Sequence, residues 1–203
     1  TWIDPSKPKP ETPDALLAFD TGPANALIND LMAQRLGQDY DANGELAAQG
    51  QVHDQIIADF LTHPYFFKIP PKSLDRDTFQ NLQDAVSALT DADASATLTA
   101  ATALSVSEAM QHCPSPPETL WVAGGGRHNQ TMMQMIAVST NCAVKPVEDA
   151  DLNGDMLEAQ AFAYLAVRVA RGLPTSCPGT TGVNASVCGG TLSTPGRLTQ
   201  VVE

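Results

Sequence analysis

Apolar residues recur every three or four positions over much of this chain, and that spacing predicts amphipathic helices. We expect one helix that begins at Pro23 and another that ends near Val138. Further helices are expected at residues 52–61, 75–89, 93–113 and 155–171. Short apolar runs beside proline, glycine and aspartate predict strands at 1–4, 16–19, 119–123 and 143–147, and more weakly at 190–192. Together these elements indicate an α/β chain.

One segment carries more information than the rest. The strand at 119–123 runs into Gly124-Gly125-Gly126, a helix follows, and the strand at 143–147 completes a βαβ-like unit. Such a unit favours a parallel strand pair with a right-handed crossover. Glycines let a ligand approach the backbone, and N–H groups at a helix start can hold an anion. The segment is therefore a candidate nucleotide or phosphate site, although a plain tight turn explains it equally well.

The residues around the glycines leave a second ligand open. Asn129 or Arg127 would add a polar or stacking contact to a nucleotide. NAD is the alternative, because Gly124 and Gly126 match the first two fingerprint glycines and Glu148 lies near the distance of the ribose-binding acid. The third glycine position holds Asn129, however, and the unit lies late in the chain, so the NAD match is weak.

Asp20, Thr21, Gly22 and Pro23 lie where a predicted strand passes into a helix. A carboxylate at such a place can hold water or a magnesium ion, and Gly22 would let a phosphate approach. Taken alone, the residues favour a simpler interpretation. Asp20 and Thr21 then cap the helix, and Pro23 occupies its first turn.

Two further charged side chains are candidates. Glu158 opens the apolar run 159–169, where the helix dipole favours a carboxylate in any case. Alanines at 159, 161 and 163 predict the close approach of another helix, which would leave Glu158 at a cleft. Lys72 follows two prolines and could meet a phosphate, although a solvated lysine is the commoner case. The histidines lack metal-ligand spacing and no nucleophile elbow is present, so we expect neither a metal cluster nor a hydrolase triad.

Bulk composition narrows the range of functions. The 203 residues include 23 acidic and 11 scattered basic ones, a formal net charge of −12, so no nucleic-acid partner is expected. No apolar run approaches the roughly 18 residues of a membrane span, and no signal peptide is evident. The 4 cysteines lack paired spacing, which predicts reduced thiols and a cytoplasmic protein. Because the chain begins with Thr1 rather than Met, we expect a fragment of a longer protein.

A series of short motifs, in one order, resembles the C-terminal part of the anhydro-N-acetylmuramic acid kinases. These are cell-wall-recycling enzymes of the actin/hexokinase/Hsp70-like ATPase superfamily. The motifs are F-D-T-G-P-A-N (19–25), H-P-Y-F (63–66), P-P-K-S (70–73), A-T-L-T-A (96–100), G-G-G-R-H-N (124–129), L-E-A-Q-A-F-A-Y-L-A (157–166) and T-T-G (180–182).

The resemblance implies a fold and an activity. Residues 1–203 would be a single C-terminal lobe of ribonuclease H-like fold, with a central mixed sheet flanked by many helices. The N-terminal lobe, with its G-T-S-x-D-G motif and the catalytic aspartate, would be absent from this chain. The whole enzyme would use ATP and Mg²⁺ to phosphorylate O6 of the sugar while water opens its 1,6-anhydro bridge, giving N-acetylmuramic acid 6-phosphate. The lone lobe would be inactive.

The resemblance also assigns site residues. Gly124, Gly125, Gly126 and Asn129 would bind the nucleotide. Asp20, Gly22 and Pro23 would lie near its phosphates, with Asn25 beside them toward the substrate, and Glu158 would contact the sugar.

Two positions depart from the family pattern, because Ala24 stands where glycine is common and Asn29 where aspartate is common. The loss of charge at Asn29 supports a rival interpretation, a non-catalytic binding or dimerisation module of the same fold. A homodimer is plausible under either interpretation.

Overall fold

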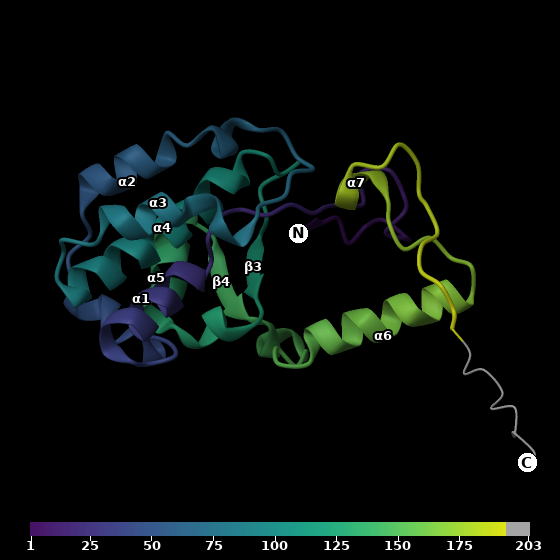
Figure 1. Ribbon diagram of the computed structural model, residues 1–203. Coiled ribbons are helices and arrows are strands. Elements are labelled where there is room, and N and C mark those ends of the chain that lie inside the picture. Colours follow the sequence, from purple (N-terminus) through teal and green to yellow (C-terminus); the bar gives the residue numbers. More distant parts are fainter. Residues whose placement is uncertain (194–203) are drawn as a thin grey trace, which may run out of the picture.

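The computed structural model describes residues 1–193, and helix α4 (Asp91–Met110) lies within its larger group of helices, on the left of Figure 1. The other helices and strands are β1 (Trp2–Ile3), β2 (Leu16–Leu17), α1 (Ala26–Leu36), α2 (Asp54–Leu61), α3 (Gln80–Ala85), β3 (Thr119–Val122), α5 (Gln130–Thr140), β4 (Ala143–Pro146), α6 (Leu157–Ala170) and α7 (Pro178–Thr181). Short 3-10 helices occupy Ala42–Gly44, Ala47–Gln49, Pro64–Phe67, Arg76–Phe79, Gly125–His128 and Val147–Ala150.

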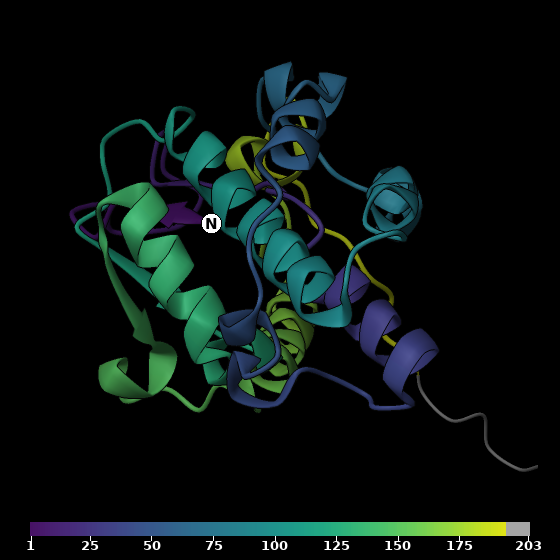
Figure 2. The same cartoon turned by 90° about the vertical axis from the view of Figure 1, so that its left-hand side faces the viewer.

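The sequence of α4 explains both its start and its burial. Thr90 caps the helix by accepting the N–H of Asp93 at 3.2 Å, and acidic residues occupy the first turn, where the helix dipole favours them. Its alanines are small enough for α1, α2 and α5 to pack closely around it. Figure 2 shows α4 passing through the middle, with α5 (green) on one side and α1 (purple) on the other. Residues from Ala94 to Ala103 are buried throughout.

Hydroxyl side chains inside α4 remain satisfied despite this burial. Thr97, Thr99 and Ser105 each donate to the carbonyl four residues earlier, at 2.7 to 2.8 Å. This local bond lets a polar side chain sit in an apolar core without an orphaned donor. Ser95 instead donates to the buried carboxylate of Asp41 at 3.0 Å.

An aromatic cluster completes the core of what we call the helical body, residues 19–150. Its rings pack mostly edge to face, with centroids 4.9 to 6.2 Å apart. The cluster comprises Phe60, His63, Tyr65, Phe66 and Phe79, all but the histidine buried. Contacts of this kind fix ring orientation as well as burying area.

The strand prediction is confirmed in part. β3 and β4 form a parallel pair in which Thr119 lies opposite Ala143, joined through α5 as the βαβ pattern predicts. β1 and β2 form an antiparallel pair with Trp2 opposite Leu17. Within residues 1–193 these are two separate two-stranded sheets, so the expected central mixed sheet is not confirmed, whereas a mixed α/β fold is.

The helix expected from Pro23 begins later, at Ala26. Asp20 and Thr21 do not cap it; the N-cap is Asn25, without a side-chain bond. The cause is local, because Ala24 adopts a left-handed φ of 49° that no α-helix contains. The capping interpretation of Asp20 was therefore wrong.

Two other predictions need correction. The helix expected at 75–89 is a 3-10 turn followed by α3, which ends at Ala85 because the Arg35 guanidinium binds the next carbonyls, those of Val86, Ser87 and Leu89. No strand forms at 190–192 in the described chain, since Gly190 has a left-handed φ of 86°. The bridge nearby joins Ser176 and Val187 instead.

A second region, which we call the outer unit, consists of residues 1–18 and 157–193. In Figure 1 α6 extends away from the helical body toward α7 and the N-terminal segment. Ala18 donates its N–H to Gly179 at 2.7 Å, and Arg168 near the end of α6 pairs with Glu11. Against the described residues no side chain of α6 is buried, so the close helix contact expected from its alanines is not formed within 1–193.

Two expectations from composition can be compared with the described chain. All four cysteines, Cys113, Cys142, Cys177 and Cys188, lie within it as free thiols, as predicted. No helix within residues 1–193 is both long and apolar enough to span a bilayer.

Candidate functional site

Two loops that the sequence selects independently lie against each other. A Cβ added to Gly126 would lie 3.6 Å from both polar atoms of the Asn25 carboxamide, and one on Gly125 would lie 3.7 Å from its nitrogen. The loop 20–25 and the glycine turn 124–126 thus meet at Asn25, although about a hundred residues separate them. The structure therefore brings these candidate residues together.

The glycine turn presents bare backbone to open space. Gly124 has φ 69°, a conformation that disfavours a side chain, yet a Cβ there would meet nothing within 4 Å. A 3-10 turn follows, so α5 starts at Gln130 rather than directly after the glycines. The geometry suits a ligand lying on the backbone.

Gly22 has a different reason to be glycine. A Cβ there would stand 2.3 Å from the Ser105 hydroxyl oxygen of α4, far inside contact distance. Thr102 of the same helix donates to the carbonyl of Ala24 at 2.8 Å. The loop is therefore pressed onto α4, and packing alone accounts for Gly22; its approach to a phosphate stays a prediction. Pro23 lies in the same half-buried loop.

Asp20 is held firmly by the segment 65–74. Its carboxylate accepts the N–H of Leu74 at 2.8 Å, and its backbone N–H donates to the carbonyl of Lys72 at 3.2 Å. The Tyr65 hydroxyl donates to the carbonyl of Asp20 at 2.6 Å. Burial, and secondarily the Asp20 charge, raises the pKa of Tyr65 to about 12, so this hydroxyl stays a donor. The Asp20 side chain itself is exposed.

Asn129 has a structural role that its motif does not reveal. Its carboxamide oxygen caps α5 by accepting the N–H of Met132 at 2.9 Å. Gly44 packs so closely that a Cβ there would come 2.1 Å from this oxygen. Asn129 is 7% exposed, and its contact with a nucleotide stays a prediction.

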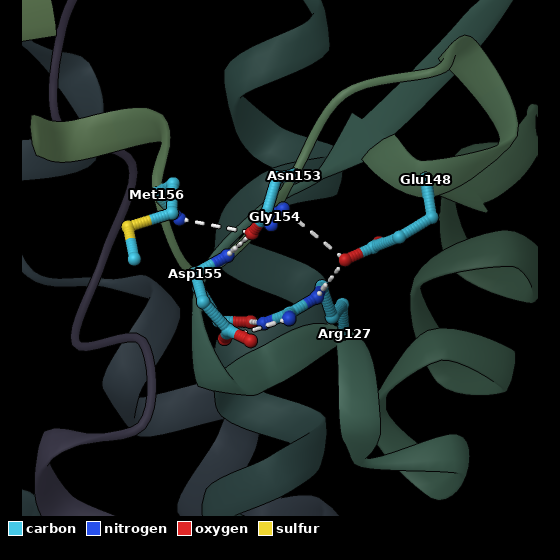
Figure 3. A network of polar contacts seen from close by, with 7 residues as sticks. Arg127, Glu148, Asn153, Gly154, Asp155 and Met156 are labelled. Carbon is cyan, nitrogen blue, oxygen red and sulfur yellow. Dashed lines mark hydrogen bonds and ion pairs between the residues drawn. The ribbon is translucent and has the colours of Figure 1, made fainter. Parts of the chain in front are cut away.

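Arg127 joins the glycine turn to the start of α6 (Figure 3). Its guanidinium donates to Glu148 at 2.8 Å, to Asp155 at 2.7 Å and to the carbonyl of Gly124 at 2.8 Å. The arginine side chain is 4% exposed, whereas those of Glu148 and Asp155 are 45% and 74% exposed. Arg127 is therefore a buried anchor rather than a free ligand contact.

The same network occupies Glu148, the acid that the NAD alternative required. Glu148 also accepts the N–H of Gly154 at 3.1 Å, and a Cβ on Gly154 would clash with Arg127 at 2.5 Å. The bond from Arg127 is the main cause that lowers the pKa of Asp155. The pKa of Glu148 is lowered mainly by a hydrogen bond from the backbone N–H of Glu148 itself, and then by the bonds from Arg127 and Gly154. No sequence periodicity signals this network, because Glu148 lies in a single 3-10 turn and Asp155 in the turn before α6.

The remaining candidates lie at the edges of the site. Glu158 is exposed in the first turn of α6, three residues after Asp155. Lys72 is half-buried and directed at the protein: its ammonium lies 3.2 Å from the Tyr65 carbonyl and 4.6 Å from the centre of the Tyr65 ring. Among residues 1–193 no three histidine, cysteine or acidic side chains gather closely enough to hold a metal ion.

The fold thus defines an α/β protein in which a parallel strand pair leads into a glycine turn that contacts a proline-containing loop. A family model described as anhydro-N-acetylmuramic acid kinase matches residues 8–195. The chain belongs to the anhydro-N-acetylmuramic acid kinase family.

Individual relatives carry the same description. The chain is 59% identical over 203 residues to an anhydro-N-acetylmuramic acid kinase of Roseobacter denitrificans, covering all of this chain and 54% of the relative. It is 57% identical over 195 residues to that of a Ruegeria species, covering 96% and 52% of the two chains. For the kinase of Cereibacter sphaeroides the identity is 59% over 198 residues, covering 98% and 53%. The chain spans about half the length of these relatives.

Proposed function

We propose that this chain is the C-terminal lobe of a sugar kinase. The full-length protein would use ATP to phosphorylate O6 of 1,6-anhydro-N-acetylmuramic acid while water opens the anhydro bridge. The product would be N-acetylmuramic acid 6-phosphate. The observation that carries the proposal is the meeting of the loop 20–25 with the glycine turn, in a chain whose family bears this kinase's name.

Each loop has a role in the proposal. The bare backbone of Gly124–Gly126 would carry the nucleotide, with Asn129 holding the following helix in place. Gly22, Pro23 and Asn25 would border its phosphates, and Glu158 would bind the sugar. Support for this last role comes from the Arg127 network, because it ties the start of α6 to the glycine turn.

Magnesium fits the residues near Asp20. One carboxylate oxygen is taken by the N–H of Leu74, while the other has no hydrogen bond among the described residues and the side chain is exposed. Mg²⁺ takes one or two carboxylates and fills its other positions with water and phosphate oxygens. It would supply charge neutralisation on the transferred phosphate. Asp20 is therefore the residue that we propose to hold it, directly or through water.

The proposal includes a second lobe, contributed by the other half of the full-length protein. In the described structure Phe162, Tyr164 and Val167 of α6 are 65%, 54% and 49% exposed, although apolar side chains of this size are normally covered. The relatives are about twice as long as this chain. We propose that the other half covers exposed side chains of α6, completes the central sheet and supplies the catalytic base.

The test is mass spectrometry of 1,6-anhydro-N-acetylmuramic acid incubated with Mg·ATP. The full-length protein and the 203-residue chain are assayed in parallel. We expect the full-length protein to add one phosphate and one water, and the lone chain to add neither. A folded full-length protein that forms no product would favour the non-catalytic module. Turnover by the lone chain would contradict the two-lobe proposal.

A further inference from the structure

Tyr65 connects three parts of the site at once. It lies in the 3-10 helix Pro64–Phe67, is 2% exposed, and packs within the aromatic cluster. Its hydroxyl donates to the carbonyl of Asp20 at 2.6 Å, the shortest bond that this loop makes with the segment 65–74. The buried Tyr65 ring thus fixes the position of the Asp20 backbone carbonyl.

Lys72 holds the other side of Tyr65. Its ammonium lies over the ring at 4.6 Å, donates to the Tyr65 carbonyl at 3.2 Å, and is 3.3 Å from Nε2 of His112. A second aromatic face, that of Phe19, is 5.7 Å away. Carbonyls and ring faces of this kind satisfy a cation. Burial, and to a smaller extent Lys68, lowers the pKa of Lys72.

Both residues thereby contact the Asp20 backbone. The backbone carbonyl of Lys72 accepts the N–H of Asp20, and Leu74 donates to the Asp20 carboxylate. A lysine in a proline-containing loop suggests a phosphate contact, but this ammonium is directed at the protein.

We propose that Tyr65 and Lys72 are positioning residues, with Lys72 holding Tyr65 and Tyr65 holding Asp20, so that the free carboxylate oxygen of Asp20 keeps a fixed place in the site. The inference rests on the proposed function for its catalytic consequence. Groups that act on a phosphoryl transfer must be held within fractions of an ångström, so a looser Asp20 lowers turnover more than substrate binding.

The test uses the full-length protein with Tyr65→Phe, Lys72→Met and the double variant. Tyr65→Phe removes one hydrogen bond, and we expect kcat to fall about 3- to 10-fold with KM for ATP unchanged. Lys72→Met keeps the length of the side chain and loses its charge; we expect a similar fall. Because Lys72 acts through Tyr65, the double variant should be no slower than the slower single variant. Tyr40→Phe and Lys9→Met, both at exposed positions of the chain, are the matched controls.

Hydrogen exchange gives a readout that needs no turnover. In the full-length protein, peptides covering 19–25 and 70–75 should exchange faster in both single variants and not in the controls. Unchanged exchange would overturn the inference even if kcat falls. Independent effects that multiply in the double variant would also overturn it, as would a raised KM for ATP in Lys72→Met, because that would indicate a phosphate contact. If the wild type has no activity, the proposed function fails, and hydrogen exchange still decides whether the two residues hold Asp20.

Discussion

Helices α4 and α6 are both rich in alanine, yet their surroundings are opposite. In α4 the residues from Ala94 to Ala103 are buried, and its hydroxyls are satisfied inside the core. In α6 not one residue is buried against the described chain, and its two aromatic residues are more than half exposed. Helix α4 thus has its packing partners within the described chain, whereas α6 has no buried residue there.

The difference shows that apolar content alone does not decide which helix is buried. A helix of the length of α6, 14 residues, is marginal in water without tertiary contacts. Its exposed apolar side chains therefore add stability only where something covers them, which we propose to be the other half of the full-length protein. The helical body should respond to core substitutions in the lone chain, and α6 only in the full-length protein.

Leu98→Ala and Phe162→Ala give the largest contrast. Leu98 in α4 is 1% exposed, and its truncation should lower the free energy of unfolding of the 203-residue chain by about 2–5 kcal/mol. Phe162, 65% exposed, should change it by less than about 0.5 kcal/mol. Urea denaturation of both variants measures the two values.

The same Phe162→Ala substitution in the full-length protein should cost about 3–5 kcal/mol if the other half covers α6. Equal small losses in both proteins would mean that α6 remains exposed, and the proposed lobe contact would be wrong. Val138→Ala serves as the control, because Val138 is 84% exposed on α5 in the helical body.

Two glycines of the candidate site repeat this contrast between tight packing and open space. Gly22→Ala would place a Cβ 2.3 Å from Ser105, and such overpacking should cost about 1–3 kcal/mol. Gly125→Ala would meet only Asn25 at 3.7 Å, so stability should change by less than about 0.5 kcal/mol. Thermal denaturation compares them.

Ser105→Gly tests the cause. In that background the added methyl group of Gly22→Ala has room, so most of its penalty should disappear. A penalty that persists in the double variant would show that the Gly22 backbone, rather than its contact with α4, requires glycine.

How far the sequence predicts this molecule depends on the distance between interacting residues. The β3–α5–β4 unit was predicted because its signals are local: apolar runs, a glycine turn and a helix in succession. Asp20 was misread as a cap because its partner Leu74 lies 54 residues away. Arg127 was considered only as a ligand contact, since its partners Glu148 and Asp155 lie in a short 3-10 turn and a turn, where no periodicity points to them.

Ala24→Gly should stabilise the chain, because Ala24 adopts a left-handed φ of 49°. The substitution removes the strain of the side chain, and the greater entropy of glycine in the unfolded state offsets part of this gain. The free energy of unfolding should therefore rise by about 0.5–1 kcal/mol. Ala33→Gly within α1 should instead lose about 0.5–1 kcal/mol, and urea denaturation of both distinguishes the signs. Destabilisation by Ala24→Gly would mean that the loop does not hold this conformation.

The joint between the two regions should be sensitive to acid. In the folded state Arg127 is the main cause that holds the pKa of Asp155 below its ordinary value of 3.8. The pKa of Glu148 is held below 4.5 first by its own backbone N–H and then by Arg127. The stabilisation is therefore complete above the unfolded pKa values and is lost as the pH falls through the folded ones. The wild type should have a larger free energy of unfolding than Arg127→Met, and this difference should become smaller as the pH falls from about 5 to about 3. Urea denaturation across this range measures the difference. A difference in the free energy of unfolding that stays constant with pH would mean that Arg127 stabilises the protein through its bond with the Gly124 carbonyl, within the helical body. No ion pair would then connect α6 to the helical body.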